Sequence, residues 1–534
     1  MGPGGRIAAA ALVGALLFGA CGGSAPAATP RAADPSARSA GDPLQAGYNP
    51  AAALVADDAF RPQGDGFQFE NYGGMLSDGS APLNMTAADV RTMFGDRVCA
   101  DAQAGRCDLI PEAQAWLDDV NREMAAGHCY GFSVTSQLLW AGKLDPHTFG
   151  APSITNMDIA GNQPLQRQIA SDWAEQLLDS VRSKAVVGTP KEVLAALRRS
   201  LKPNPSELYT VVIFKRDGNG GHAVTPYGVE DKGGGHFNVL IYDNNWPNDS
   251  RAISFDTNAN TWNYDAAINP KAGSELYDGD AKSQTIALLP VLPGQGIQPC
   301  PFCDKARSTT PSTGGAPASQ ASRLGEIYLD GNDTDHADLL VTDQRGRRIG
   351  YVNGRLVQEL PGAHVDQVIA DQDWAENGEP HFYVPPRSRY TIQIDATRLK
   401  KADTETVGVI GPSYFLTIKN VSVHPGDKAT LTIDPVTTTA TFTAPRSQPL
   451  TIDVGASGDP ADFSVELQGA SDPHHRTIHL GLTPAVLTVS YGASAPPTTV
   501  NAAITRETNQ GVEFFVRSRV PVSGPTTVPL TNGP

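Results

Sequence analysis

Hydrophobic residues follow two different spacings along the chain. Between about residues 86 and 201 they recur every three or four positions, which is the period of helices with one buried face. Capping boxes at Thr86 and Thr189 mark the starts of two of these helices. Beyond residue 323, apolar and polar residues alternate in short runs between turn residues, as in a β-sandwich. The pattern predicts an α+β region followed by an all-β region.

The first region also contains three β-branched runs, over residues 208–215, 222–230 and 236–242, which predict consecutive antiparallel strands because glycine-rich turns separate them. His222 opens the second run, and Asp243 and Asn244 directly follow the third. Adjacent residues of a regular strand face opposite sides, so only one of these two can point at His222. We favour Asp243.

The stretch GHCYGFSVTSQLLWAG, residues 127–142, places Cys129 where a loop becomes a helix. A helix N-terminus carries exposed N–H groups and a partial positive charge, and both stabilise a thiolate over a thiol. Such a position lowers a cysteine pKa from about 8.5 by one to several units. The sequence therefore marks Cys129 as a candidate nucleophile.

The words GHCYGFS, GGHAVTPYGV and IYDNNWP occur in the order cysteine, histidine, carboxylate or amide. This order resembles the papain-like cysteine hydrolases, and the last two words look most like their bacterial C39-like branch. The resemblance covers about residues 60–295 and implies that Cys129 is the nucleophile and His222 the general base and acid. It also implies that Asp243, or Asn244 as the alternative, orients the imidazole. The phrases FENYGG and GHCYG are also similar to a group of exported bacterial proteins of unassigned function.

One position departs from the papain-like pattern. Six residues before the cysteine, where the family usually has a glutamine as oxyanion-hole donor, this chain has Glu123. A carboxylate cannot donate unless it is protonated, so the backbone N–H of Cys129 and a second group, for which we name Asn121, would have to act. Losing one such donor costs about two to three orders of magnitude in acyl transfer. His236, one strand after His222, is the alternative base.

The N-terminus reads as an export signal, with Arg6 followed by a short apolar run over residues 7–20. The step LFGAC resembles a bacterial lipobox, which implies cleavage before Cys21 and a lipid on its sulfur. Simple secretion, with cleavage near residues 25–27, is the alternative. We therefore expect a signal peptide over 1–20 and a flexible tether over 21–58, with the protein lipid-anchored to the outer face of the bacterial cell membrane.

Composition and cysteine content narrow the function further. With 41 basic and 57 acidic residues the net charge is −16, which disfavours nucleic acid and makes the lipid the only expected contact with the membrane. In an oxidising compartment we expect two disulfides, Cys99–Cys107 and Cys300–Cys303. A zinc site formed by these four cysteines is the alternative to the disulfides. Cys129 is left outside these pairs, and we expect it to act as a catalytic nucleophile. We predict no cofactor and no metal.

The chain divides into several expected segments. A papain-like domain spans 59–304, a Ser/Thr/Pro/Gly-rich linker 305–322 and a β-sandwich 323–442, while 443–534 forms a second sandwich or completes the first. We expect a monomeric cysteine hydrolase that acts on a peptide or isopeptide amide of a peptide or protein substrate. The alternative is a catalytically weak or inactive papain-like fold that serves as a cell-surface binding or adhesion lipoprotein.

Overall fold

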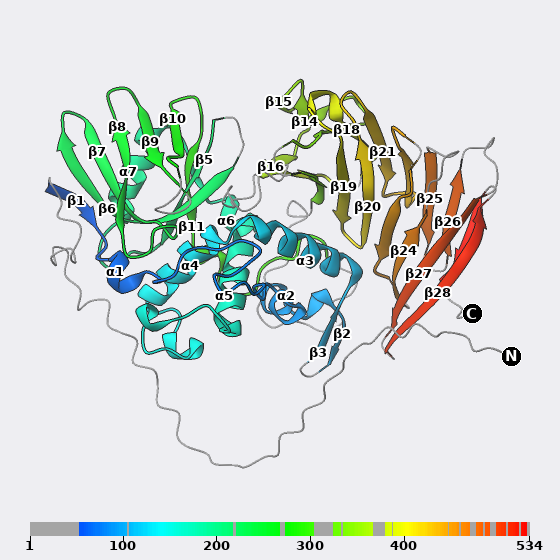
Figure 1. Ribbon diagram of the computed structural model, residues 1–534, viewed down its shortest axis with the longest axis horizontal. Helices are drawn as coiled ribbons and strands as arrows, with labels where there is room; N and C mark the ends of the chain where they lie inside the picture. The colour runs from blue at the N-terminus through cyan, green and yellow to red at the C-terminus, as the bar shows by residue number, and fades with distance from the viewer. Residues whose placement is uncertain are drawn as a thin grey trace, which may run out of the picture.

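The computed structural model describes residues 53–530, except 104–105, 217–219, 268–272, 304–323, 333–334, 367–379, 387, 447, 459–460, 470–476, 484–485, 492–497, 509–510 and 523–524. The described chain forms an α+β half followed by a β-rich half, as predicted from the hydrophobic pattern (Figure 1). The signal peptide, Cys21 and the linker 305–322 lie outside the described residues.

A large antiparallel sheet organises the first half. Its order is β10 (Leu276–Asp280), β9 (Thr261–Asp265), β8 (Ser250–Asp256), β7 (His236–Tyr242), β6 (Gly221–Gly233), β5 (Tyr209–Phe214), β11 (Ile286–Pro290) and β4 (Val186–Val187). A further strand, β1 (Ala53–Asp57), pairs with β6. The expected flexible tether therefore ends before residue 53, because the backbone of residues 53–57 is hydrogen-bonded into the sheet.

Helices cover both faces of this sheet. The described helices are α1 (Pro62–Asp65), α2 (Ala87–Phe94), α3 (Pro111–Glu123), α4 (Cys129–Trp140), α5 (Gln163–Ala174), α6 (Asp179–Arg182) and α7 (Pro190–Ser200). On one face, α4 packs against β5, β6 and α5. On the other face, Val193, Leu194 and Leu197 of α7 share a core with Val211 and Val224. The capping boxes that start α2 and α7 are confirmed.

The second half consists of two antiparallel sheets around one apolar core. One sheet runs β16 (His364–Asp366), β17 (His381–Val384), β12 (Gly325–Asp330), β19 (Asp403–Gly411), β20 (Tyr414–Val423), β23 (Thr451–Ala456), β24 (Asp462–Gln468), β27 (Thr498–Thr508), β28 (Gly511–Val522). The other runs β15 (Arg355–Gln358), β14 (Arg348–Val352), β13 (Asp338–Asp343), β18 (Tyr390–Asp395), β21 (Lys428–Asp434), β22 (Thr439–Thr443), β25 (Thr477–Thr483), β26 (Val486–Tyr491), β29 (Thr526–Pro529). Strands from before and after residue 442 join both sheets, so residues 443–530 complete one sandwich.

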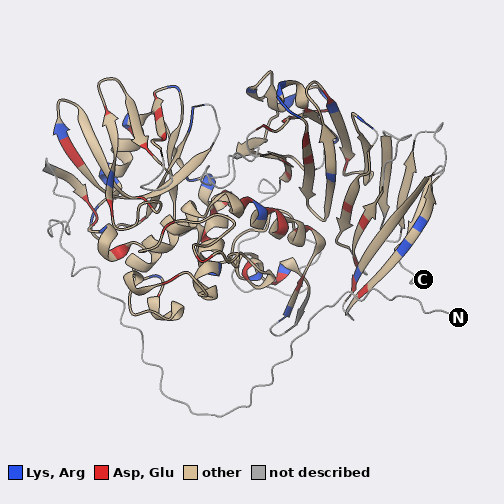
Figure 2. Cartoon of the chain, in the orientation of Figure 1, with Lys and Arg blue, Asp and Glu red and all other residues tan. Residues whose placement is uncertain are grey.

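The two halves share a packed boundary. Helix α3 lies against β19, β20, β23 and β24 (Figure 1). Tyr328, Ile410 and Phe415 of the sandwich belong to the same apolar cluster as residues of α2, α3 and α4. Acidic and basic residues are interspersed over both halves (Figure 2). The boundary therefore combines apolar packing with the charged side chains of α3.

Candidate functional site

Cys129 is the first residue of α4 and is completely buried. The preceding Gly127 has a φ of +126°, a backbone conformation that side chains disfavour, and it turns the chain into the helix. The first-turn N–H groups of a helix have no acceptor within the helix. The Cys129 side chain therefore lies at the end of α4 where the helix dipole favours negative charge. This is the position that the sequence predicted for Cys129.

His222 and Asp243 form a buried pair at neighbouring ends of β6 and β7. His222 Nε2 lies 2.9 Å from Asp243 Oδ1, and neither residue is exposed to solvent. Burial alone raises the pKa of Asp243, but the charge of His222 and hydrogen bonds from His222, Tyr264 and the Asn245 N–H hold it below its usual value. Asp243 is therefore ionised at neutral pH and fixes the orientation of the imidazole.

Tyr264 and Arg251 extend this pair beyond what the sequence analysis identified. The Tyr264 hydroxyl donates to Asp243 Oδ2, and Arg251 Nε donates to the Tyr264 oxygen at 2.7 Å. The guanidinium of Arg251 also stacks 3.8 Å from the centre of the Trp246 ring. Arg251 lies on β8, which pairs with β7, and Tyr264 lies on β9, the next strand of the sheet. No sequence motif marked them, because strand pairing brings them to the site.

Asn244 has a different task from Asp243. Its Nδ2 donates to Cys129 O at 3.1 Å and to Ala223 O at 2.9 Å. One amide group thus ties the first residue of α4 to the residue after His222. The structure places Asp243 against the imidazole and uses Asn244 to hold the two elements together.

The phrase FENYGG forms an irregular arm, residues 69–74, that lies over the start of α4. Asn71 Oδ1 accepts from the His128 N–H at 3.0 Å, its Nδ2 donates to Asn245 Oδ1 at 3.1 Å, and its own N–H donates to Asn244 O at 2.9 Å. Tyr72 O lies 2.8 Å from His128 Nδ1. Asn71 thus joins the cysteine loop to the loop after β7, a role that the sequence analysis missed although it noted the phrase.

His128 is a structural group. Nδ1 faces Tyr72 O, and Nε2 lies 3.0 Å from Asn84 Oδ1. Desolvation lowers the pKa of His128 to about 4 against a small opposing effect of the Tyr72 carbonyl. The imidazole next to Cys129 is therefore neutral at physiological pH, and His222 is the histidine paired with a carboxylate at the site.

Asn121, the oxyanion candidate, and Glu123, at the usual glutamine position, are both engaged away from Cys129. The Asn121 carboxamide is engaged with the backbone of Met85, donating to its carbonyl and accepting from its N–H, each at 3.0 Å. Glu123 points toward the sandwich, with Oε1 4.0 Å from His381 Nε2. The alternative base, His236, is 60% exposed and lies 3.9 Å from Asp256 instead of joining the site.

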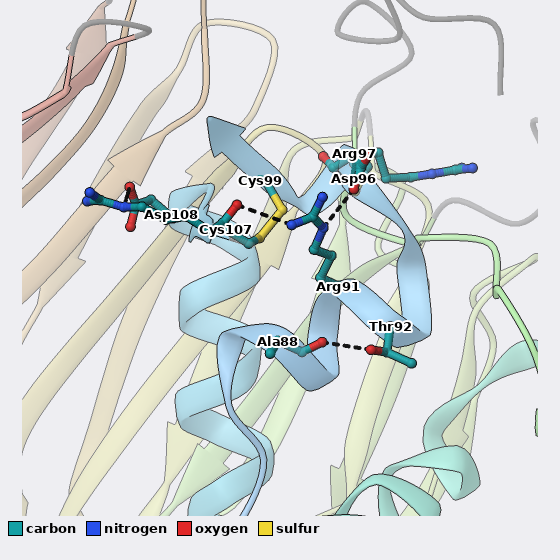
Figure 3. The surroundings of a disulfide bond; sticks show 10 residues. Ala88, Arg91, Thr92, Asp96, Arg97, Cys99, Cys107 and Asp108 are labelled. Carbon is teal, nitrogen blue, oxygen red and sulfur yellow. Dashed lines mark hydrogen bonds and ion pairs between the residues drawn. A yellow bond between two sulfur atoms is a disulfide. The ribbon is translucent and has the colours of Figure 1, made fainter. Parts of the chain in front are cut away.

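Both predicted disulfides are confirmed, Cys99–Cys107 and Cys300–Cys303, and Cys129 lies outside them. The first closes the hairpin of β2 (Cys99–Gln103) and β3 (Arg106–Leu109) (Figure 3). Beside it, Arg91 points toward Asp96 (Figure 3), and its Nε lies 2.7 Å from Asp96 Oδ1. With these four sulfurs bonded in pairs, the alternative zinc site is not formed.

No family model, curated protein or solved structure matches this chain. In the part of the chain that the structure describes, no helix is long and apolar enough to cross a bilayer. The functional assignment therefore depends on the geometry of the site itself.

Proposed function

We propose that this protein is a papain-like cysteine hydrolase, anchored at the cell surface through Cys21, that cleaves a peptide or isopeptide amide. The observation that carries the proposal is the buried pair of His222 and Asp243, whose Nε2 and Oδ1 atoms are 2.9 Å apart, with His222 on β6, a strand that packs against the helix that begins with Cys129. Because Nε2 faces Asp243, Nδ1 is the ring nitrogen that can exchange a proton with a thiol. This division of the ring nitrogens suits a cysteine–histidine–carboxylate triad.

The residues of the site divide the proposed reaction among them. The Cys129 thiolate attacks the amide carbonyl, and first-turn N–H groups of α4 stabilise the oxyanion. His222 gives its proton to the leaving amine and then takes one from the water that hydrolyses the thioester. Asp243 stabilises the imidazolium that exists before the first proton transfer and again after the second, and Asn244 and Asn71 hold the reacting loops in register.

The enclosure of the site favours a second candidate function. Cys129, His222 and Asp243 are all buried, and the arm over residues 69–74 packs against their loops. Glu123 is turned away, so it contributes no donor at the usual glutamine position. These features fit a binding or adhesion protein whose papain-like fold has lost most of its activity.

Thiol alkylation separates the two candidates. We would follow iodoacetamide labelling of Cys129 against pH, locating the label by peptide mass so that other thiols are excluded. Wild type should react with an apparent pKa well below about 8.5, and His222→Ala should react slowly at neutral pH. That result would indicate an ion pair between the Cys129 thiolate and the His222 imidazolium, and it would justify a screen of peptide and isopeptide substrates.

His236→Ala is the matched control, because it removes an exposed histidine beside a carboxylate without touching the site. Its labelling profile should equal that of wild type. If Cys129 is inert, or if its pH profile is the same without His222, the hydrolase proposal fails and the binding function is favoured.

A further inference from the structure

A second cluster of buried titratable groups lies where the two halves meet, away from Cys129. Asp119 comes from α3, Glu326 from β12 and His381 from β17, with exposed fractions of 0%, 5% and 1%. One donor atom from each lies within 4.8 Å of the others. Side chains of this type are rarely buried unless something compensates their charge or polarity.

The imidazole of His381 is oriented as in many metal sites. Its Nδ1 lies 2.6 Å from Glu326 Oε1, and Tyr383 donates to the same oxygen at 3.0 Å. With Nδ1 against Glu326, Nε2 is the ring nitrogen that faces α3. Burial alone lowers the pKa of His381, but the hydrogen bond to Glu326 and the neighbouring carboxylates raise it to about 9, so a bound cation would take the place of the Nε2 proton. A histidine that ligates a metal usually donates its other N–H to a carboxylate in this way.

Two carboxylate oxygens face His381 Nε2. Asp119 Oδ2 lies 3.9 Å and Glu123 Oε1 4.0 Å from His381 Nε2, both too far for a hydrogen bond. Asp119 Oδ1 accepts from Arg122 at 2.5 Å, but the buried Oδ2 has no hydrogen-bond partner among the described residues. A buried carboxylate oxygen aimed at an imidazole nitrogen across such a gap is what a bound cation would satisfy.

The charge around the gap points to a cation. Four carboxylates lie close enough to interact with the charge of His381, namely Asp119, Glu123, Glu326 and Asp330, while Arg122 is a permanent cation and lies 3.0 Å from Asp330. A divalent ion would offset most of the excess negative charge. Zinc binds imidazole nitrogen at about 2.0–2.1 Å and carboxylate oxygen at about 2.0–2.2 Å, so tetrahedral donors are about 3.3 Å apart. Each carboxylate therefore needs to approach His381 by only about 0.6 Å.

We propose that Asp119, Glu123 and His381 bind one zinc ion, with Glu326 as the outer carboxylate that orients the imidazole. A mixed nitrogen and oxygen donor set suits zinc better than calcium or magnesium, which prefer oxygen alone. Water enters from the side of Glu123, whose side chain is 11% exposed, as the fourth ligand. The ion joins α3 to β17 and thereby fastens the first half to the sandwich. The sequence predicted no metal because His381 lies more than 250 residues from Asp119 and Glu123.

The test uses the full chain, freed of metal and titrated with Zn²⁺ by calorimetry, with bound zinc counted by elemental analysis. Wild type should bind one zinc tightly and unfold at a higher temperature when zinc is present. Asp119→Asn and His381→Gln should abolish this site. Glu326→Gln keeps the three inner ligands and should weaken zinc binding about 10- to 100-fold. It tests the site even if the other two variants fail to fold.

Two control variants exclude other sites. Cys129→Ser removes the candidate catalytic thiol, and His236→Gln removes an exposed histidine that also lies 3.9 Å from a carboxylate. Both should still bind one zinc, and Co²⁺ in the site should give tetrahedral visible bands without a thiolate charge-transfer band. The proposal is overturned if wild type binds no zinc, or if folded Asp119→Asn or Glu326→Gln binds it as tightly as wild type.

Discussion

Asp243 and Asn244 show how adjacent side chains divide the work of the site. Asp243 holds the imidazole of His222, whereas Asn244 joins two backbone carbonyls that belong to α4 and β6. The first contact affects the charge and orientation of a reacting group. The second affects only the packing of elements, so substitutions at the two positions should have different consequences.

We expect Asp243→Asn to lower the rate of Cys129 alkylation at pH 7 by at least about tenfold, because the imidazolium loses its counter-charge. Asn244→Ala should instead lower the free energy of unfolding by about 2–4 kcal/mol, since two buried carbonyls lose their donor. Alkylation kinetics and urea unfolding measure the two effects. Equal effects of both variants on both measurements would contradict the division of roles.

Tyr264 is predicted to act as a positioning residue through Asp243. Tyr264→Phe removes the hydroxyl that donates to Asp243 Oδ2, so the pKa of Asp243 should rise and its hold on His222 should weaken. We expect a several-fold slower alkylation of Cys129 and a shifted pH profile. Tyr209→Phe on β5 serves as the control, and a profile identical to wild type in Tyr264→Phe would remove this role.

At the scale of elements, the GHCYG phrase is explained partly by helix packing. A Cβ on Gly131 would lie 2.1 Å from the carbonyl oxygen of Ile169 in α5. The second glycine therefore permits the close approach of α4 and α5 and takes no part in the proposed chemistry. His128, three residues before Gly131, likewise has a structural role, through its hydrogen bonds to the arm over residues 69–74.

Gly131→Ala tests the close approach of these helices. The added methyl must displace a backbone carbonyl, so the free energy of unfolding should fall by about 1–3 kcal/mol despite the better helix propensity of alanine. Thermal unfolding measures the loss. Gly79→Ala in a loop with open space gives a comparison in which only backbone strain contributes, because Gly79 has a φ of +83°.

One part of the pH dependence of stability follows from His128. Its pKa falls from about 6.5 in the unfolded chain to about 4 in the folded protein. At this group the unfolded state therefore binds more protons between these values, so the contribution of His128 to stability decreases by about 3 kcal/mol as the pH falls from about 6.5 to about 4. Burial raises the pKa of Asp119 and of Asp172 to about 7, and these two groups contribute in the opposite direction. The His128 contribution is therefore measured as the difference between wild type and His128→Gln in urea unfolding, and this difference should shrink as the pH falls.

At the scale of the whole molecule, the two halves behave as one packed body. Tyr328 and Phe415 of the sandwich enter the core of the helical half, Arg122 reaches Asp330 at 3.0 Å, and the hydroxyl of Ser457 donates to Glu112. These contacts join segments that are distant in sequence. The linker over residues 305–322 is therefore not what keeps the halves together.

A protease site inserted within residues 305–322 should test this association. After cleavage, the two fragments should still elute together in gel filtration, because the shared apolar cluster remains buried. Phe415→Ala should lower the urea concentration at which they separate, since removal of a buried phenylalanine costs about 3–5 kcal/mol. Immediate separation of the cleaved wild type would show that the halves are independent domains.

The sequence alone determined the local features of this protein. Capping residues located the starts of α2 and α7, the Gly-His-Cys step located the start of α4, and alternation predicted the β-rich second half, because these signals act within a few residues. Cysteine spacing gave both disulfides. The same local reasoning placed Cys129 at a helix start and His222 at the start of a strand.

Only the tertiary structure decided how distant segments meet. It placed Asp243 rather than Asn244 on the imidazole, added Tyr264 to the pair, and turned Glu123 and Asn121 to other partners. It also made β1 from the end of the expected tether and brought Asp119 to His381. These contacts depend on strand pairing within the sheet and on the docking of the two halves, which arise from the summed packing of many side chains and leave no short-range pattern in the sequence.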